Sequence, residues 1–304
     1  SRRGEPQDIV GYMRSQSQVP IMTNSESILQ FGSNAYAKPA TALNILRETI
    51  LGRELFDYAF KQYARRWRFR RPMPADFFRT MEDASGIDLD WFWRGWFYST
   101  AHTDISIEKV RLFEVDARDP VLQKKRRKQA KKDEPRTLAQ QRNEDVPKRI
   151  DTFPELKDFY NSYDELAVTP DDRKAFARFV KKLNDQERKL LQSKQKFYVV
   201  DLQNIGGLVM PVILDLEFED GAHREVRIPA EIWRRNNKQV SKLIITSKAV
   251  RTVTLDPHLE TADVDLENNH FPRKVVKSRF QLFKSKQQQR NQMQKSKPDP
   301  KRKK

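Results

Sequence analysis

A tyrosine near the start of the chain is the side chain that we select as a candidate for chemistry. Tyr36 precedes a helix predicted from Pro39, where apolar residues begin to recur at helical spacing, to Gly52, which suits the left-handed residue found after a helix end. The ordinary pKa of a tyrosine phenol is about 10, so the hydroxyl is protonated at neutral pH and can donate a hydrogen bond. The alternative interpretation is a tyrosine buried in the core.

Three more helices are predicted downstream, and their aromatic residues would supply core and pocket wall. The first begins at Glu54 and ends before Pro72, because proline interrupts the hydrogen bonding of a helix interior. The next begins at Pro74 and is closed by Gly86, and Asp88 is the expected N-cap of the last. The first hundred residues are therefore predicted to be helical.

Several short motifs in this part of the chain follow one another in a characteristic order. They are Asn34-Ala35-Tyr36-Ala37-Lys38-Pro39-Ala40, Ile50-Leu51-Gly52, Glu82-Asp83-Ala84-Ser85-Gly86-Ile87-Asp88-Leu89 and the stretch from Trp93 to Trp96. Over residues 20–100 the series resembles the zinc aminopeptidases of the membrane-alanyl-aminopeptidase type, which are gluzincin metallopeptidases related to leukotriene hydrolase. The sequence departs from that pattern at Pro39, where glycine is commoner, and at Thr100-Ala101-His102, where a Ser-Gly-x-Pro exit is usual.

The resemblance implies a role for Tyr36 and a cofactor. In the family, the matching tyrosine donates a hydrogen bond to the oxyanion formed at the scissile carbonyl of a peptide substrate, and zinc is held by His-Glu-x-x-His and a later glutamate. This chain has four histidines, and no two of them lie four residues apart: His102, His223, His258 and His270.

We therefore expect the zinc ligands to lie upstream, in a longer metallopeptidase of which this chain, which starts at Ser1, is the carboxy-terminal part. The chain alone is expected to be neither a zinc protein nor a peptidase. Many relatives of this kind are exported in bacteria, and the resemblance extends that localisation to this protein as an implication.

The period of the apolar residues changes after Asp104, from helical to alternating. Strands are predicted at Ile105–Leu112, Phe197–Val200, Val212–Phe218, Arg224–Ile228, Val240–Ser247 and Val250–Asp256, with a tight turn at Asp220-Gly221. A charged helical insertion is predicted at 118–195, with helix starts at Thr152-Phe153-Pro154-Glu155 and Thr169-Pro170-Asp171-Asp172.

The predicted fold class is thus α+β. It comprises the helical end of a gluzincin catalytic domain over 1–100, an antiparallel β-sandwich domain over 101–283 that contains the insertion, and a basic, disordered tail over 284–304.

Positive charge is concentrated in two segments. The net charge is +17, and residues 273–304 carry 13 Lys or Arg against one acid, Asp299, while residues 124–132 carry seven more. The remainder is close to neutral, so nucleic acid is an unlikely partner, and a nucleic-acid-binding protein is the weakest of the alternatives. No apolar run is long enough for a transmembrane segment, and the absence of cysteine excludes disulfides and thiol catalysis.

Two further stretches have a functional and a plain interpretation. Arg65–Arg71 mixes arginines with Trp67 and Phe69, as a nucleic-acid groove would, but a cationic last helical turn with inward aromatics explains it as well. Asp256–Asn269 is rich in oxygen ligands, yet it lacks the spacing of a calcium loop, so we expect turn caps there. A noncatalytic relative that binds a partner is the leading alternative to a peptidase.

The tail generates the first testable prediction. Deleting the residues after Phe283 removes charge and glutamine but no apolar periodicity, so the melting temperature should be nearly unchanged while most binding to a polyanion such as heparin is lost. Calorimetry and a binding titration on the two chains check both outcomes. A large fall in melting temperature would mean that the tail docks on the folded part.

Overall fold

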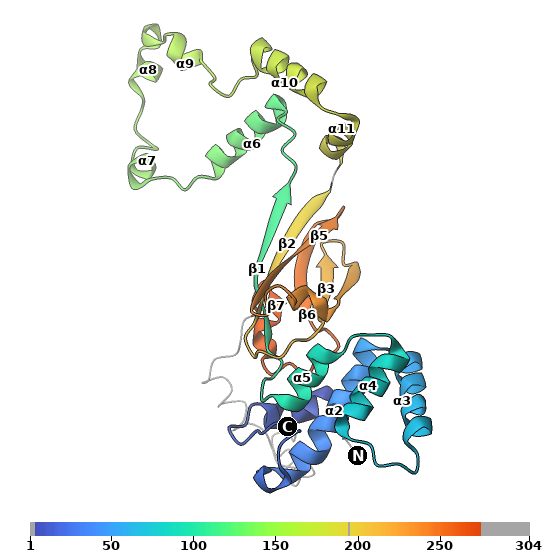
Figure 1. Ribbon diagram of the computed structural model, residues 1–304. Coiled ribbons are helices and arrows are strands. Elements are labelled where there is room, and N and C mark those ends of the chain that lie inside the picture. The colour runs from blue at the N-terminus through green and yellow to red at the C-terminus, as the bar shows by residue number, and fades with distance from the viewer. Residues whose placement is uncertain (1–3, 194, 275–304) are drawn as a thin grey trace, which may run out of the picture. The chain divides into compact units, whose positions relative to one another are not determined.

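The computed structural model describes residues 4–193 and 195–274 and divides into two compact units. Unit 1 comprises Ser1–Leu112 and Phe197–Lys304, and unit 2 comprises Phe113–Lys196. The predicted insertion, 118–195, falls within unit 2 (Figure 1). The predicted tail, 284–304, lies outside the described residues.

The amino-terminal part of unit 1 is helical, and both α-helices and π-helical or 3-10 segments contribute to it. In chain order these elements are η1 Pro6–Ile9, α1 Val10–Met13, η2 Ser25–Ser27, η3 Gly32–Ala37, α2 Lys38–Ile45, η4 Leu46–Ile50, α3 Arg53–Trp67, α4 Pro74–Ser85 and α5 Asp90–Tyr98. No helix in the described part of the chain is long and apolar enough to cross a membrane.

The first long helix begins earlier than the sequence predicts. Its backbone is already helical from Gly32, in the π-helical segment η3, and not only from Pro39. The left-handed conformation expected for Gly52 was wrong, because its φ is positive, 79°, but its ψ of 155° lies in a region that is open to glycine alone, and Gly52 is the N-cap of α3. The expectation for Asp88 was wrong by one residue, because the N-cap of α5 is Leu89.

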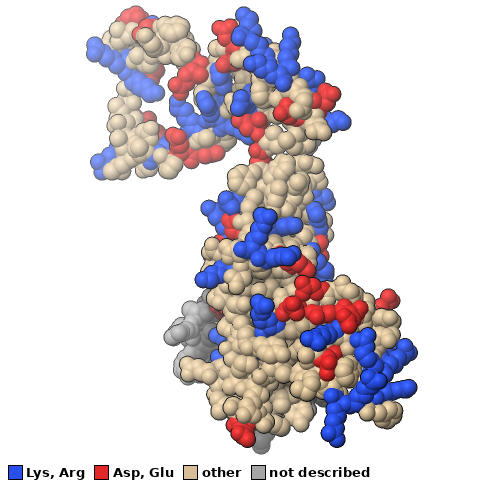
Figure 2. All heavy atoms as spheres, in the orientation of Figure 1, with Lys and Arg blue, Asp and Glu red and all other residues tan. Residues whose placement is uncertain are grey.

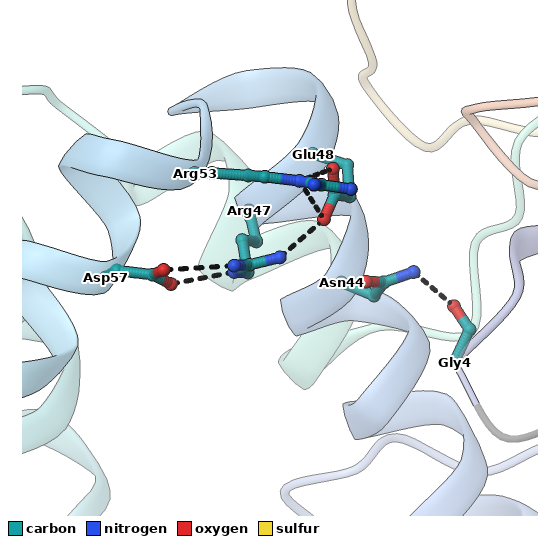
Figure 3. Close-up of polar contacts among 6 residues, drawn as sticks. All are labelled: Gly4, Asn44, Arg47, Glu48, Arg53 and Asp57. Carbon is teal, nitrogen blue, oxygen red and sulfur yellow. Dashed lines mark hydrogen bonds and ion pairs between the residues drawn. The ribbon is translucent and has the colours of Figure 1, made fainter.

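A charged network joins the two helices on either side of Gly52. Arg47 donates from Nε to Asp57 Oδ1 at 2.7 Å and from Nη2 to Asp57 Oδ2 at 3.0 Å, while its Nη1 reaches Glu48 Oε1 at 2.6 Å (Figure 3). Arg53 closes the network through Glu48 Oε2 at 2.7 Å. The bidentate geometry fixes the angle at which α3 leaves the turn, although ion pairs this exposed stabilise a fold only slightly.

An aromatic layer holds α4 against α5. The rings of Phe78 and Trp93 stack with centroids 4.5 Å apart, and Phe97 meets Phe78 edge-on at 5.2 Å. Next to them Trp96 is fully buried and its indole Nε1 lies 3.4 Å from the sulfur of Met210. Met210 lies between two strands, so this contact joins the helical part to the β part, and burial of each such side chain stabilises the fold by about 1.5–3 kcal/mol.

The remainder of unit 1 contains two sheets. One has the strand order β1-β2-β5, and the other has the order β4-β3-β6-β7. The strands are β1 Ile105–Glu114, β2 Lys196–Asn204, β3 Val212–Phe218, β4 His223–Ile228, β5 Gln239–Thr246, β6 Val250–Leu255 and β7 His270–Phe271, with 3-10 turns η6 Ala230–Trp233 and η7 Leu266–Asn268. Buried residues of both sheets and of the helices belong to one hydrophobic cluster.

The β3–β4 hairpin confirms the clearest strand prediction. Its antiparallel register runs from Val212 opposite Ile228 to Glu217 opposite His223, and Gly221 has a φ of 79° in the turn. β3 also pairs with β6 in the antiparallel sense. The alternation of buried and half-buried residues along β2 and β3 places one side of each strand in the common core. Helices and antiparallel sheets together make the fold α+β, as predicted.

Unit 2 consists of short helices with little core. They are α6 Pro120–Asp133, α7 Leu138–Arg142, α8 Arg149–Thr152, η5 Pro154–Leu156, α9 Phe159–Ser162, α10 Pro170–Lys182 and α11 Asp185–Gln192. The helix start predicted at Thr169 is confirmed by a capping box with Asp172. The start predicted at Thr152 was wrong, since Thr152 ends α8 and makes no cap. Among the described residues of unit 2, Pro120 alone is buried.

A close backbone approach in unit 1 generates the second prediction. A Cβ on Gly206 would lie 2.2 Å from the carbonyl oxygen of His102, so Gly206→Ala should force the two segments apart and destabilise the fold by about 1–3 kcal/mol. Gly11→Ala is the matched control, because a Cβ there meets nothing within 4 Å. Urea denaturation measures both, and equal stability of the two variants would contradict the prediction.

Candidate functional site

Tyr36 lies on the surface of the helical part, within η3. Its side chain is 55% exposed, which excludes the alternative of a buried core tyrosine. The ring of Phe31 meets the Tyr36 ring edge-on, with centroids 5.6 Å apart and an interplanar angle of 73°. The phenol therefore stands at the surface beside an aromatic neighbour that limits its orientations.

The π-helical turn around Tyr36 arises from the residues on either side of it. The amide of Lys38 donates to the carbonyl of Ser33, five residues earlier, which is the π-helical bond. Pro39 has no N–H, so the α-helical bond from residue 39 to Ala35 cannot form. Such single turns of π-helix occur frequently at functional sites, because the extra residue shifts the side chains that it presents.

Two buried polar residues anchor this turn. Asn34 is fully buried, and its Nδ2 lies 2.8 Å from the carbonyl of Val19, 3.1 Å from that of Pro20 and 3.2 Å from the Tyr12 hydroxyl. These contacts hold the residue two positions before Tyr36 against the segment that leads into the helix.

Lys38 is the second anchor, and sequence reasoning missed its burial. Its ammonium donates to Gln18 Oε1 at 2.8 Å and to the carbonyl of Ser99 at 3.3 Å, and burial lowers its pKa to about 8. A signal was available, since Lys38 shares one helical face with the buried Ala42 and Ile45. Tyr36 is therefore an exposed donor on a turn that is fixed from both sides.

The four histidines do not converge. His223 Nδ1 lies 2.8 Å from Asp215 Oδ2, which raises the pKa of His223, and His258 Nε2 lies 3.3 Å from Glu225 Oε2. His270 Nδ1 lies 3.3 Å from Thr254 Oγ1, and burial lowers its pKa. The fourth, His102, forms an isolated backbone bridge with Gly207.

One acidic group in the described part of the chain could hold an ion. Over residues 4–193 and 195–274, Glu82, Asp88 and Asp90 are the only three His, Asp or Glu side chains close enough to share a metal. Two of the three are exposed, and a set of carboxylates without histidine or cysteine does not fit zinc. Burial raises the pKa of Glu82, which accepts a hydrogen bond from the amide of Leu89.

The stretch Asp256–Asn269 forms turn caps, as expected. Asp256 has a φ of 47°, and its carboxylate accepts hydrogen bonds from the amides of Glu260 at 2.7 Å and Thr261 at 2.9 Å. The Thr261 hydroxyl adds a third bond at 2.7 Å. These donors account for both carboxylate oxygens.

A buried pair of carboxyls in the same region was not foreseen. Asp263 and Asp104 are both buried, and Asn269 and Asn268 respectively donate to them. Burial raises the pKa of Asp263 to about 7, and the charge of Asp104 acts in the same direction. The backbone amide of Ile105 also donates to Asp263, so this carboxyl ties the loop before β7 to the start of β1.

The arginine-rich stretch Arg65–Arg71 confirms its plain interpretation in part. Arg65 and Arg66 lie in the last turn of α3, whereas α3 ends at Trp67, so Arg68 and the residues after it lie beyond the helix. Trp67 packs as expected, with Nε1 donating to Thr80 Oγ1 at 3.2 Å. The expectation of inward aromatics was wrong for Phe69, which is fully exposed.

Neither a scan against models of known protein families nor a search of curated proteins finds a match for this chain. The family resemblance seen in the sequence therefore stays a prediction, and a function for this chain has to be inferred from the geometry of the described residues.

The buried carboxyl of Asp263 generates a pH prediction. Its pKa in the folded protein, about 7, lies above the ordinary value near 4, so the folded state holds the proton more tightly than the unfolded state does. The stability that this group contributes is therefore fully present below about pH 4. It is lost as the pH rises from about 4 to about 7, by about 1.4 kcal/mol per pH unit.

Asp263→Asn removes the titrating group, so the free energy of unfolding of the native protein should fall more steeply between pH 5 and pH 7 than that of the variant. Urea denaturation across the range measures both slopes. The exposed Asp83→Asn is the control and should keep the native slope. Parallel curves for the native protein and Asp263→Asn would contradict the assignment.

Proposed function

We propose that this chain is the carboxy-terminal part of a zinc-dependent metallopeptidase of the gluzincin aminopeptidase kind, which hydrolyses the amino-terminal bond of peptides. The observation that carries the proposal is the position of Tyr36, half-exposed on a π-helical turn that the buried Asn34 and Lys38 anchor. This position supports a role for the exposed phenol as a hydrogen-bond donor, in the motif that resembles this family.

The proposed role of Tyr36 is to stabilise charge that develops during the reaction. A protonated phenol can donate to the oxyanion of the tetrahedral intermediate, and such a bond is stronger in the transition state than in the ground state. A turn that is already held in place loses little entropy when the bond forms. The buried contacts of Asn34 and Lys38 support this preorganisation.

Zinc does not fit the described residues, since their single acidic group contains no histidine. In the proposal its ligands lie upstream of this chain, as do the residues that recognise the substrate. In the same proposal the helical part supplies Tyr36 and part of the pocket wall, and we assign the two sheets to the β-sandwich that follows the catalytic domain in the family. No step through the metal is derived from this chain.

A noncatalytic relative that binds a partner is the second candidate. Unit 2 favours it, because its aromatic side chains lie on the surface instead of in a core, with Tyr160 81% exposed and Phe159 and Tyr163 beside it. Exposed aromatics of this kind are typical of interaction surfaces. Hydrolysis of aminoacyl-anilide substrates by the longer protein decides between the two candidates.

Substitution of Tyr36 tests the catalytic role. In the longer protein that carries the upstream ligands, Tyr36→Phe should lower kcat by about 10²–10³ with little change in KM, the usual effect of losing one oxyanion donor. Tyr58→Phe, also exposed in the helical part, is the matched control and should keep the native kcat. Steady-state kinetics measures both, and a Tyr36→Phe enzyme that retains most of its kcat removes this residue from the mechanism.

A further inference from the structure

The loop between α3 and α4 presents an apolar side chain in an unusual way. Phe69 is 102% exposed and has a φ of 63°, which is a rare conformation for a bulky residue. Met73, near the other end of the loop, is 68% exposed. A ring this exposed, in a strained backbone, gains no stabilisation from burial among the described residues. We call Arg65–Met73 the cationic tip.

Positive charge surrounds the exposed ring. Five arginines and no acid occur in the tip, and Arg66, which reaches Asp83 at 3.4 Å, has the one ion pair found there among the described residues. The other four have exposed side chains: Arg65, Arg68, Arg70 and Arg71. Figure 2 shows Lys and Arg gathered over the part of the surface where Figure 1 places α3. The charge is thus available to a partner.

The tip is held in place at both ends. Trp67 donates from Nε1 to Thr80 at the start of the loop, and the amide of Met73 donates to Asp76 Oδ2 at 2.8 Å at its end. α3 and α4 pack along one another as a helical hairpin behind it. The exposed ring is therefore presented by an anchored loop.

We propose that the cationic tip binds the surface of a lipid bilayer that contains anionic headgroups, with Phe69 inserted at the interface and the arginines on the phosphates. An apolar side chain surrounded by cations matches the two regions of such a surface, the acyl boundary and the anionic headgroups. The ring leaves water at the acyl boundary, while the guanidinium groups stay at headgroup depth. Each basic residue close to an anionic membrane strengthens binding about five-fold.

The shape of the tip argues against nucleic acid as its partner. Single strands bind in grooves, where several aromatic platforms stack successive bases. The tip offers a single fully exposed ring on a protruding loop. A soft planar surface can accept such a ring without a complementary groove, so the observations favour the bilayer.

A local fluorescent label tests the proposal in the full chain. The protein has no cysteine, so Met73→Cys carries a single environment-sensitive dye at the tip, and Leu138→Cys, 60% exposed in unit 2, carries the control label. With vesicles of phosphatidylcholine and phosphatidylglycerol, the emission of the tip label should shift to shorter wavelength and that of the control should not. Vesicles of phosphatidylcholine alone should shift neither.

Matched variants separate the tip from the other basic segments. In the labelled chain, Phe69→Ser should lower the affinity for anionic vesicles about ten-fold, as measured by titration. Arg68→Gln, Arg70→Gln and Arg71→Gln together should lower this affinity about 100-fold. The triple variant Lys125→Gln, Arg127→Gln and Lys132→Gln removes the same charge from α6 and should leave the tip titration unchanged. Melting temperatures verify that each variant is folded.

Three outcomes overturn the proposal. They are a tip label that does not respond to anionic vesicles, a Phe69→Ser titration equal to that of the parent, and a tip label that responds to a single-stranded oligonucleotide but to no vesicle. The last of these would assign the tip to nucleic acid.

Discussion

The structure of unit 1 depends on an irregular segment, Ser99–Asp104, which runs from the exposed Thr100 to the buried Thr103 and Asp104 and whose backbone bonds to distant parts of the chain. Buried N–H and C=O groups outside helices and sheets are costly unless other parts of the chain bond to them. Lys38 and Gln18 donate to the carbonyls of Ser99 and Thr100, and the amide and carbonyl of His102 bond to the backbone around Gly206. The amide of Val264 donates to the carbonyl of Thr103, and the amides of Ile205 and Gly206 donate to the carbonyl of Asp104.

This constraint connects the candidate site to the β part of the same unit. Lys38 is buried and donates to the carbonyl of Ser99, and this contact holds the π-helical turn that carries Tyr36. The neighbouring Asn34 is also buried, with two backbone carbonyls as its acceptors. An exposed phenol between two buried anchors can meet a ligand without a change in backbone conformation, which is the property that a transition-state donor needs.

Most charged side chains lie on the surface, and the basic segments of the two units differ in how far they are paired with acids. In unit 2, the lysines of α6 pair with acids that follow α9 or begin α10, as in Lys124 with Asp172, so much of that basic cluster is neutralised locally. In the cationic tip of unit 1, all five arginines are exposed, and Arg66 alone has an ion pair among the described residues. A high local charge therefore predicts a binding surface only where the fold leaves it unpaired.

Sequence alone determined the features that depend on local periodicity. The α+β class, the helices α3 and α4 and the β3–β4 hairpin were all predicted, because each has its own pattern of apolar residues and its own turn or cap signal. Tyr36 could be selected from its motif. The helix start at Thr169 was also predicted correctly, since the residues that cap it are three residues apart.

Tertiary structure decided whatever depends on a distant partner. The early start of the helix at Gly32, the burial of Lys38 and the raised pKa of Asp263 each arise from segments far away in the sequence. The exposure of Phe69 is the reverse case, in which no distant segment covers an apolar side chain. A local pattern indicates which residues favour burial, but the long-range packing decides which of them are buried and what they contact.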